Sequence, residues 1–256
     1  MGDAADRSRR LTAPEIFEAV ARSGRDELAR SWTALALSGL AAGLTMGLSA
    51  LAVATVEDVT GPGLLPAAFY PIGFIAVIIG RQQLFTENTL YPVVLVFDER
   101  RHLADMLRLW GVVLTANLGG TFLFALLASR TPAVSPAIRQ DLVALGIEVA
   151  APSFGEVFWS GIIGGWLIAL VAWLVSASLH TIGQVAVIWL LAFLIGVGGF
   201  AHSVAATGEV FTAALVGDLG WGAWARWQAA ATLGNVAGGV VIVSLLNYGQ
   251  VRGGDR

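Results

Sequence analysis

Long apolar runs fill most of the chain, and short polar segments separate them. A helix needs about 20 residues to cross the hydrocarbon of a bilayer. The pattern therefore predicts four simple spans, over residues 32–56, 109–127, 157–175 and 227–248. Two further stretches, 65–97 and 182–216, are apolar but contain 33 and 35 residues, which is too long for one straight crossing.

Polar groups interrupt the middle of both long stretches. The first contains Arg81 and Glu87, and the second contains a glycine cluster around Gly198, followed by His202 and a single acid, Glu209. A charged side chain at this depth costs at least about 2.5 kcal/mol, and non-helical backbone is tolerated only beside protein or a water-filled cavity. The pattern predicts that helices 2 and 5 are broken, with His202 beside a cavity.

Composition supports a polytopic membrane protein. The chain is 56% hydrophobic and 13% charged, with a mean hydropathy of +0.74. It has no cysteine, which excludes a disulfide, a thiolate nucleophile or an iron–sulfur cluster. One mid-membrane histidine cannot form a bis-histidine haem, and no metal-spaced cluster or nucleotide loop appears. We therefore expect no enzyme activity, no cofactor, no metal site and no nucleic-acid partner.

The distribution of arginine predicts the orientation. All fifteen basic residues are Arg: eleven lie in the N-terminal segment, the 98–108 loop and the tail, against Arg130, Arg139 and Arg226 on the opposite side. The positive-inside rule places both termini in the cytoplasm. We expect a cytoplasmic N-terminal segment (1–30), a channel domain (31–250) and a cytoplasmic tail (251–256). Within 1–30, a capping box at Thr12 starts an amphipathic helix, which either fixes topology or gates a pore mouth.

The two halves of the chain repeat one another. Ser38–Gly43 matches Ser160–Gly165 at an offset of 122 residues, and Arg108, Asn117 and Gly120 match Arg226, Asn235 and Gly238 at an offset of 118. Three spans per half is an odd number, so the second half must be inserted upside down. The sequence predicts an all-α membrane protein with six transmembrane helices in two inverted three-helix repeats, and a permeation site between the halves.

Three motifs then resemble those of a known family. They are Leu84-Phe85-Thr86, Gly199-Phe-Ala-His-Ser-Val204 and Gly234-Asn235, in this order along residues 30–250. Together they resemble the formate/nitrite transporter family. The resemblance implies an aquaporin-like protomer in the inner membrane, a homopentamer with one pore per protomer, and passage of small monovalent anions of weak acids such as formate, nitrite or hydrosulfide.

The resemblance also implies roles for individual residues. His202 would be the central proton-exchanging histidine, Thr86 its loop partner and Asn235 the nearby amide, with Ser203 and Arg81 also on the solute pathway. Histidine suits this role because its reference pKa, about 6.5, lies near neutral pH. Apolar constrictions flank that histidine in the family, and the matching positions here are Tyr70, Phe74, Leu84, Phe85 and Ile195.

The chain departs from the family pattern at several positions. Arg81-Gln82-Gln83 replaces small residues and an acid, Ala201 replaces an acid before the histidine, and Gly165 replaces an asparagine. The family's vestibule lysine would fall near Val149. Arg81 either attracts anions in place of that lysine or forms an ion pair with Glu87 or Glu209. Two other functions stay open: a pore for small neutral solutes, and a non-conducting membrane protein that reuses the channel fold.

Overall fold

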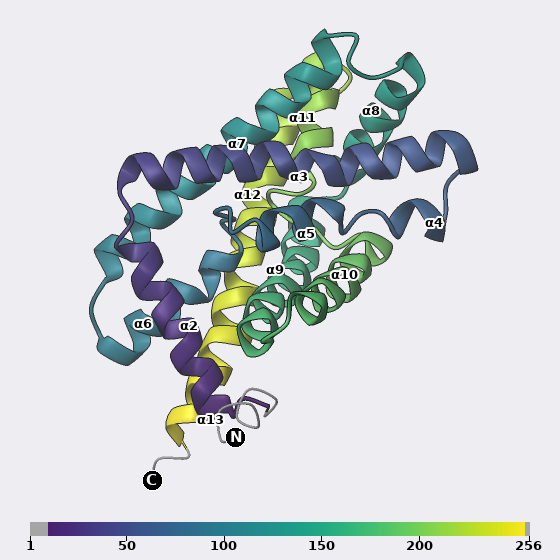
Figure 1. The fold of residues 1–256 in the computed structure, drawn as a ribbon. Coiled ribbons are helices and arrows are strands. Elements are labelled where there is room, and N and C mark those ends of the chain that lie inside the picture. The colour runs from purple at the N-terminus through teal and green to yellow at the C-terminus, as the bar shows by residue number, and fades with distance from the viewer. Residues whose placement is uncertain (1–9, 254–256) are drawn as a thin grey trace.

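The computed structural model describes residues 10–253, which form helices and no strand (Figure 1). The first half contributes α2 (Ala13–Leu28), α3 (Trp32–Thr60), α4 (Leu64–Ala67), α5 (Ile72–Ile79), η1 (Glu87–Thr89), α6 (Tyr91–Glu99) and α7 (Leu103–Arg130). The second half contributes α8 (Pro136–Ala150), α9 (Phe154–Ala177), α10 (Thr181–Gly198), α11 (Thr207–Val216), α12 (Trp221–Ala237), η2 (Gly238–Leu245) and α13 (Leu246–Gly253). The expected N-terminal segment and tail include residues 1–9 and 254–256, which lie outside the described range.

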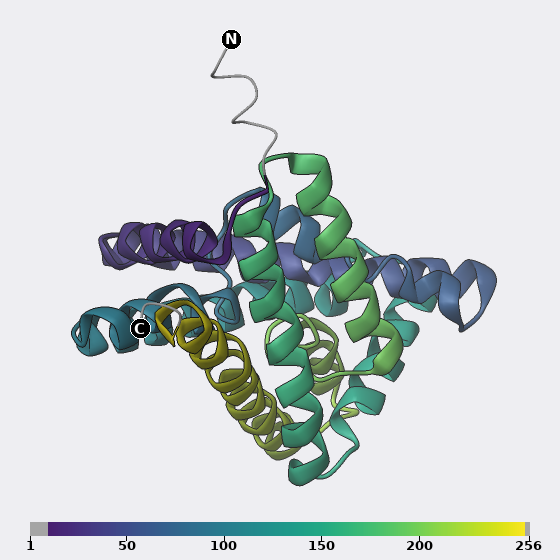
Figure 2. The same ribbon diagram turned by 90° about the horizontal axis from the view of Figure 1, so that it is seen from below.

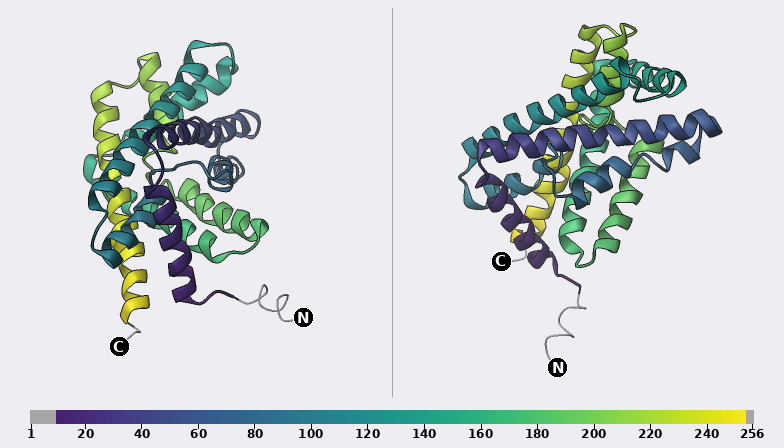
Figure 3. Two further views of the ribbon diagram at one scale, coloured as in Figure 1. Left: turned by 60° about the vertical axis from the view of Figure 1, so that its left-hand side comes forward. Right: turned by 45° about the horizontal axis from the view of Figure 1, so that its top comes forward.

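Within the described range, five helices are long and apolar enough to cross a membrane: α3, α7, α9, α10 and the continuous helix from Trp221 to Gly253. The α5 and α11 segments are apolar but shorter. Helix α3 packs along α7, and α12 packs along α9 (Figure 3). These apolar helices make the chain a multi-pass helical membrane protein.

Non-helical segments separate α5 from η1, at residues 80–86, and α10 from α11, at residues 199–206. The first segment follows α5 and contains Arg81 at a φ of 53°; the second follows α10 and begins with Gly199 at a φ of 60°. Glycine adopts this left-handed conformation without a steric penalty, whereas a side chain such as that of Arg81 does so at some cost. Both segments lie in the stretches that are too long for one crossing.

One asparagine holds the first non-helical segment in place. Asn117, on α7 and fully buried, donates from Nδ2 to the carbonyls of Gly39 and Gln83, each at 2.8 Å. Its Oδ1 accepts from the backbone N–H of Phe85 at 2.9 Å. The side chain therefore ties α3, α7 and the segment that precedes Thr86 together.

Asn235 repeats this arrangement in the second half. From α12 its Nδ2 donates to the carbonyls of Gly161 and Ala201, each at 2.8 Å, and its Oδ1 accepts from the backbone N–H of Ser203 at 2.8 Å. Each of these residues stands 118 or 122 positions after its counterpart in the first half. The repeat seen in the sequence is therefore a repeat of hydrogen bonds.

Residues 130–153 separate two of the expected spans, and helix α8 occupies much of this segment. Ser135 caps this helix by accepting from the backbone N–H of Ile138 at 3.2 Å, and Pro136 takes the first helical position. Proline is tolerated there because its missing N–H would have no helical partner. Arg226 donates to the carbonyls of Ala150 and Pro152 at the end of α8.

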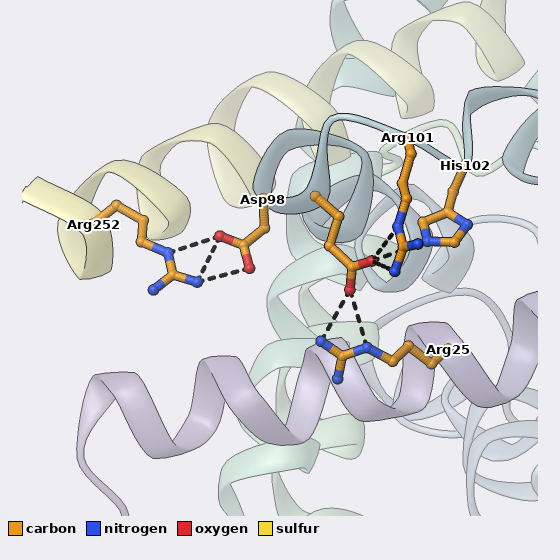
Figure 4. Close-up of polar contacts among 6 residues, drawn as sticks. Arg25, Asp98, Arg101, His102 and Arg252 are labelled. Atoms are coloured by element: carbon orange, nitrogen blue, oxygen red, sulfur yellow. Dashed lines mark hydrogen bonds and ion pairs between the residues drawn. The ribbon is translucent and has the colours of Figure 1, made fainter.

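Helices α2, α6 and α13 gather at one end of the molecule (Figure 2). Thr12 and Glu15 form the predicted capping box that starts α2. Figure 4 shows ion pairs that join the three helices: Glu99 of α6 accepts from Arg25 of α2, and Asp98 of α6 pairs with Arg252 of α13. Charged contacts therefore hold α2 and α13 against α6.

Candidate functional site

The two non-helical segments meet at a hydrogen bond between Thr86 and His202. Oγ1 of Thr86 lies 2.8 Å from Nε2 of His202, and both side chains are fully buried. The two residues are 116 positions apart and come from different halves of the chain. The fold therefore brings together two of the residues that the family motifs single out.

Contacts on the other ring nitrogen define the tautomer of His202. Nδ1 accepts the backbone N–H of Ala205 at 2.9 Å, and the N–H of Val204 lies at 3.4 Å. A nitrogen that accepts carries no proton, so the neutral ring is protonated on Nε2 and donates to Thr86 Oγ1. The hydroxyl hydrogen of Thr86 is then left for a second acceptor.

Aromatic rings and one hydroxyl complete the surroundings of His202. The ring of Phe74 packs edge-on against the imidazole ring, with the two centroids 5.0 Å apart. The ring centroid of Tyr70 lies 5.7 Å from that of Phe74. Ser203 is buried, and its Oγ has no hydrogen-bond partner among the described residues. A solute at this point would meet mostly apolar walls and a few hydroxyl groups.

Four of the five expected pathway residues form one cluster, and the fifth lies apart. Asn235 fixes the backbone on both sides of His202 through Ala201 and Ser203, rather than touching the imidazole ring. Arg81 is exposed and belongs to the wall of a separate cavity. The structure thus joins Thr86, His202, Ser203 and Asn235 but leaves Arg81 at a distance from the histidine.

A cavity of about 590 Å³ lies on one side of this cluster. It is walled by residues of α3, α4, α8, α9, α10, α11 and α12, and we call it the α8-side cavity. Tyr70 and Ile195, two of the expected constriction residues, line it, as does Ala201 next to His202. Val149, the position matched to the family's vestibule lysine, also lines it.

A second cavity, of about 360 Å³, lies beside α2 and is called here the α2-side cavity. Leu84, two residues before Thr86, belongs to its wall, together with charged residues of both signs: Arg22, Asp26, Glu27, Arg81 and Glu87. The two cavities share no lining residue within the described chain, and neither Thr86 nor His202 lines either one. The buried pair is therefore closed off from both cavities.

The expected constriction residues divide between these places. Leu84 borders the α2-side cavity, Tyr70 and Ile195 border the α8-side cavity, and Phe74 contacts His202 directly. Phe85 lines neither cavity, because its ring packs against Trp110 with the centroids 5.8 Å apart.

The structure bears on both alternatives for Arg81. Pairing with Glu209 is wrong, because Glu209 lines the α8-side cavity while Arg81 lines the other. Glu87 shares the cavity of Arg81, yet no ion pair within 4.0 Å joins them in the described part of the chain. Arg81 does not occupy the place of the vestibule lysine either, because Val149, the matched position, lines the α8-side cavity.

The sequence did not predict that four acidic residues would line the same cavity, the α8-side cavity. Glu57, Glu148 and Glu156 come from α3, α8 and α9, and Glu57 lies far from the other two in the sequence. Glu209 left a signal, because it is the single acid in the stretch 182–216. Its place in a cavity wall requires the folded arrangement of α11.

Comparison with known proteins decides the family. The family model described as "Formate/nitrite transporter" matches residues 14–249. The chain belongs to the formate/nitrite transporter family. Members of this family are transporters and channels, and the match covers both halves together with helix α2.

Individual relatives agree with this family. The chain is 37% identical to "Inner membrane protein YfdC" of Escherichia coli (strain K12), over 94% of this chain and 79% of that protein. It is 27% identical to a "Probable formate transporter" of Methanothermobacter thermautotrophicus, over 72% and 74% of the two chains. It is 23% identical to "Formate channel BtFdhC" of Bacillus thuringiensis, over 91% and 93%.

Solved structures show the same fold. An "FNT family ion channel" superposes with a TM-score of 0.82 at 22% identity, covering 93% of this chain and 98% of that one. A "Pentameric formate channel with formate bound" gives a TM-score of 0.65 at 20% identity, covering 89% and 97%. At these identities the likeness describes the fold of the transporter and leaves its solute open.

Proposed function

We propose that this member of the formate/nitrite transporter family passes small monovalent anions of weak acids, such as formate or nitrite, through each protomer. The observation that carries the proposal is the buried hydrogen bond between Thr86 and His202, with a separate cavity on either side of it. The names of the relatives, a probable formate transporter and a formate channel, support this class of solute. The proposed protein is a transporter without enzyme activity.

The proposal includes a topology. Six transmembrane helices form two inverted three-helix repeats in an aquaporin-like protomer, and the second and fifth spans are broken. The protein lies in the inner membrane, with both termini in the cytoplasm. The matching hydrogen bonds of Asn117 and Asn235 support the repeat. In this orientation the α2-side cavity opens to the cytoplasm, and the α8-side cavity opens to the opposite side.

The mechanism follows from the polarity of the buried pair. A bare anion loses its hydration in an apolar constriction, a cost that the uncharged acid avoids. His202 donates from Nε2 to Thr86, so the Thr86 hydroxyl hydrogen is available to an arriving anion, and Ser203 Oγ offers a second hydroxyl. The solute passes as the neutral acid or as an anion accompanied by a proton, with His202 taking part in the proton exchange.

Arg81 is proposed to attract anions into the α2-side cavity. Its side chain is exposed in the wall of that cavity and forms no ion pair within the described residues. We expect Arg81→Gln to weaken anion flux and to leave the assembly intact. Arg22→Gln, in the same wall, is the matched control for loss of one positive charge, and equal effects of the two changes would remove any special role for Arg81.

Flux through purified protein in liposomes tests the central proposal. We expect entry of formate or nitrite that depends on pH, and we expect His202→Ala to abolish that dependence. Thr86→Val should reduce flux about tenfold, since loss of a buried hydrogen bond costs about 1–3 kcal/mol, whereas Thr86→Ser keeps the hydroxyl.

Two results would replace the proposal with another function. Passage of a neutral solute such as glycerol, without passage of weak acids, would indicate a pore for neutral solutes. The absence of any flux from correctly assembled protein would indicate a non-conducting membrane protein.

A further inference from the structure

The α8-side cavity carries carboxyl groups along its length. Glu57, Glu148 and Glu156 line it from α3, α8 and α9 and are half-buried or exposed, and Glu209 lines it from α11 with only 5% of its surface exposed. Among the described residues that line it, none is Arg or His, and the chain has no Lys. The charged side chains in the wall of this cavity are therefore all acidic.

Basic residues on the neighbouring helices are engaged elsewhere. Arg226 donates to the carbonyls of Ala150 and Pro152, and Arg130 donates to the carbonyl of Leu215. Neither guanidinium group belongs to the cavity wall. Besides the four acids, the titratable residue that lines this cavity within the described chain is Tyr70.

Glu209 adds an independent observation. Its Oε2 is buried and has no hydrogen-bond partner within the described chain. A buried polar atom normally has a partner, so this oxygen is an acceptor available to a donor in the cavity. The protonated form of a weak acid brings an O–H donor, whereas the anion brings only acceptors.

Electrostatics leads to the same conclusion. Charges of one sign in a cleft with low-dielectric walls focus the field and change the local concentration of a charged solute. Two like charges 4 Å apart repel by about 1 kcal/mol even in bulk water, and by more near protein. An anion is therefore depleted in this cavity, while an uncharged acid is not.

We propose that the α8-side cavity excludes anions, so that a weak acid crosses it in its uncharged, protonated form. Glu57, Glu148 and Glu156 supply the negative wall, and Glu209 accepts a hydrogen bond from the protonated solute. This inference rests on the proposed function and specifies the charge state of the solute on one side of the site. The α8-side cavity would then be a negatively charged entry, whereas an entry with a vestibule lysine is positively charged.

A single cysteine tests the charge of the wall directly, because the chain has no native cysteine. Glu148→Cys, at an exposed position, is reacted in liposomes with membrane-impermeant methanethiosulfonates that carry a positive or a negative charge, and with a neutral reagent as the steric control. The charged reagents modify only molecules whose α8-side cavity faces the outside. Asp218→Cys, in the exposed loop after α11 and outside the cavity wall, is the matched control.

The probes are formate, which has a protonated form, and nitrate, which has essentially none near neutral pH. We expect the unmodified protein to carry formate at a rate that follows the concentration of formic acid, and to carry little nitrate. The positive adduct at position 148 should raise nitrate entry about tenfold at low salt. This gain should shrink at 1 M salt, where the Debye length falls to about 3 Å. The negative adduct should restore the exclusion of nitrate.

Glu209 has its own test. Glu209→Leu should lower formate entry at low pH about tenfold, and Glu209→Gln, which keeps a carbonyl acceptor, should retain it. If formate flux depends neither on the charge of the adduct nor on the concentration of formic acid, this inference is wrong. The proposed function would be unaffected by that result. Entry of methylammonium through the unmodified protein would also overturn it, in favour of a cation site. A lack of formate flux in every protein would overturn both proposals.

Discussion

Two asparagines keep the non-helical segments in place. A residue in such a segment has backbone groups that no helix satisfies, and within a membrane water does not replace the missing partners. Asn117 satisfies two of these groups in the first half, and Asn235 satisfies two in the second. Each asparagine also donates to a carbonyl of a neighbouring helix. Thr86 and His202 meet because each is attached to a segment that an asparagine holds.

We expect Asn117→Leu to destabilise the protein by at least about 2–3 kcal/mol. The change leaves the N–H of Phe85 and the carbonyl of Gln83 without their partner, and each buried unsatisfied group costs about 1–3 kcal/mol. Asn247→Leu is the control, because its amide donates only to the carbonyl of Val243 among the described residues and is half-buried. The midpoint of thermal unfolding in detergent measures both, and a smaller loss for position 117 than for 247 would contradict this role.

At the scale of helices, glycines set how closely the spans approach one another. A Cβ at Gly43 of α3 would meet the backbone of Asn117, and a Cβ at Gly165 of α9 would meet the backbone of Asn235. Backbone cannot move aside as a side chain does. The same glycine contact therefore fixes both helix pairs that carry the asparagines.

Gly43→Ala and Gly165→Ala should each lower stability by about 1–3 kcal/mol, the usual cost of overpacking. A Cβ at Gly111 in α7 would meet nothing within 4 Å among the described residues. Gly111→Ala should be neutral or slightly stabilising, since Ala is favoured over Gly in a helix by up to about 1 kcal/mol. Chemical or thermal unfolding of the three variants side by side gives the comparison. Equal effects at all three positions would show that close helix contact is not the cause.

The ion pairs on α6 predict a response to acid. Hydrogen bonds from Arg101 and His102, with a further one from Arg25, lower the pKa of Glu99 to about 2 from an ordinary value near 4.5. A lowered pKa means that Glu99 contributes stability above about pH 4.5 and loses that contribution as the pH falls toward 2.

Glu99→Gln tests this contribution. The variant should be less stable than the parent at pH 7, and the difference should shrink below about pH 4.5. Proteolysis of α2 and the unfolding midpoint at several pH values report the effect. Glu18→Gln, on the same helix as Arg25, is the control, because Glu18 is exposed and forms no ion pair with another described residue. If the difference in stability between parent and Glu99→Gln stays constant with pH, apolar contacts rather than these ion pairs hold α2, α6 and α13 together.

The sequence predicted helices better than connections. Apolar length indicated the positions of α3, α7, α9 and the continuous helix from Trp221 to Gly253. Each extends beyond its expected bounds, because hydropathy does not report the polar turns at helix ends. Helix α8 was not predicted, although the Ser135 cap that starts it is readable in the sequence. The capping box of α2 was predicted correctly because it depends on residues three positions apart.

The motifs of the candidate site were visible in the sequence, but its surroundings were not. Thr86 and His202 could be named from motifs, and the fold brings them within hydrogen-bond distance. The acids of the α8-side cavity come from four helices, so their convergence depends on how the whole molecule packs. Local patterns carry no information about such convergence.

The assembly of the whole molecule leads to the last prediction. We propose a homopentamer with one pore per protomer, an assembly supported by the shared fold with the pentameric formate channel. The Thr86–His202 pair and the lining of both cavities come from one chain of 26.7 kDa. Each protomer therefore holds a complete candidate pathway, and native mass should correspond to five chains.

Mixed assemblies distinguish a pore in each protomer from one central pore. Parent chains and His202→Ala chains are co-expressed in known ratios, and formate flux is measured for each mixture. Independent pathways predict flux that falls in direct proportion to the fraction of variant chains, because each intact protomer still contains its own histidine and both cavities. A shared pore at the centre would lose flux far more steeply, since one variant chain would disturb the whole assembly. A linear dependence would locate permeation within the single chain described here.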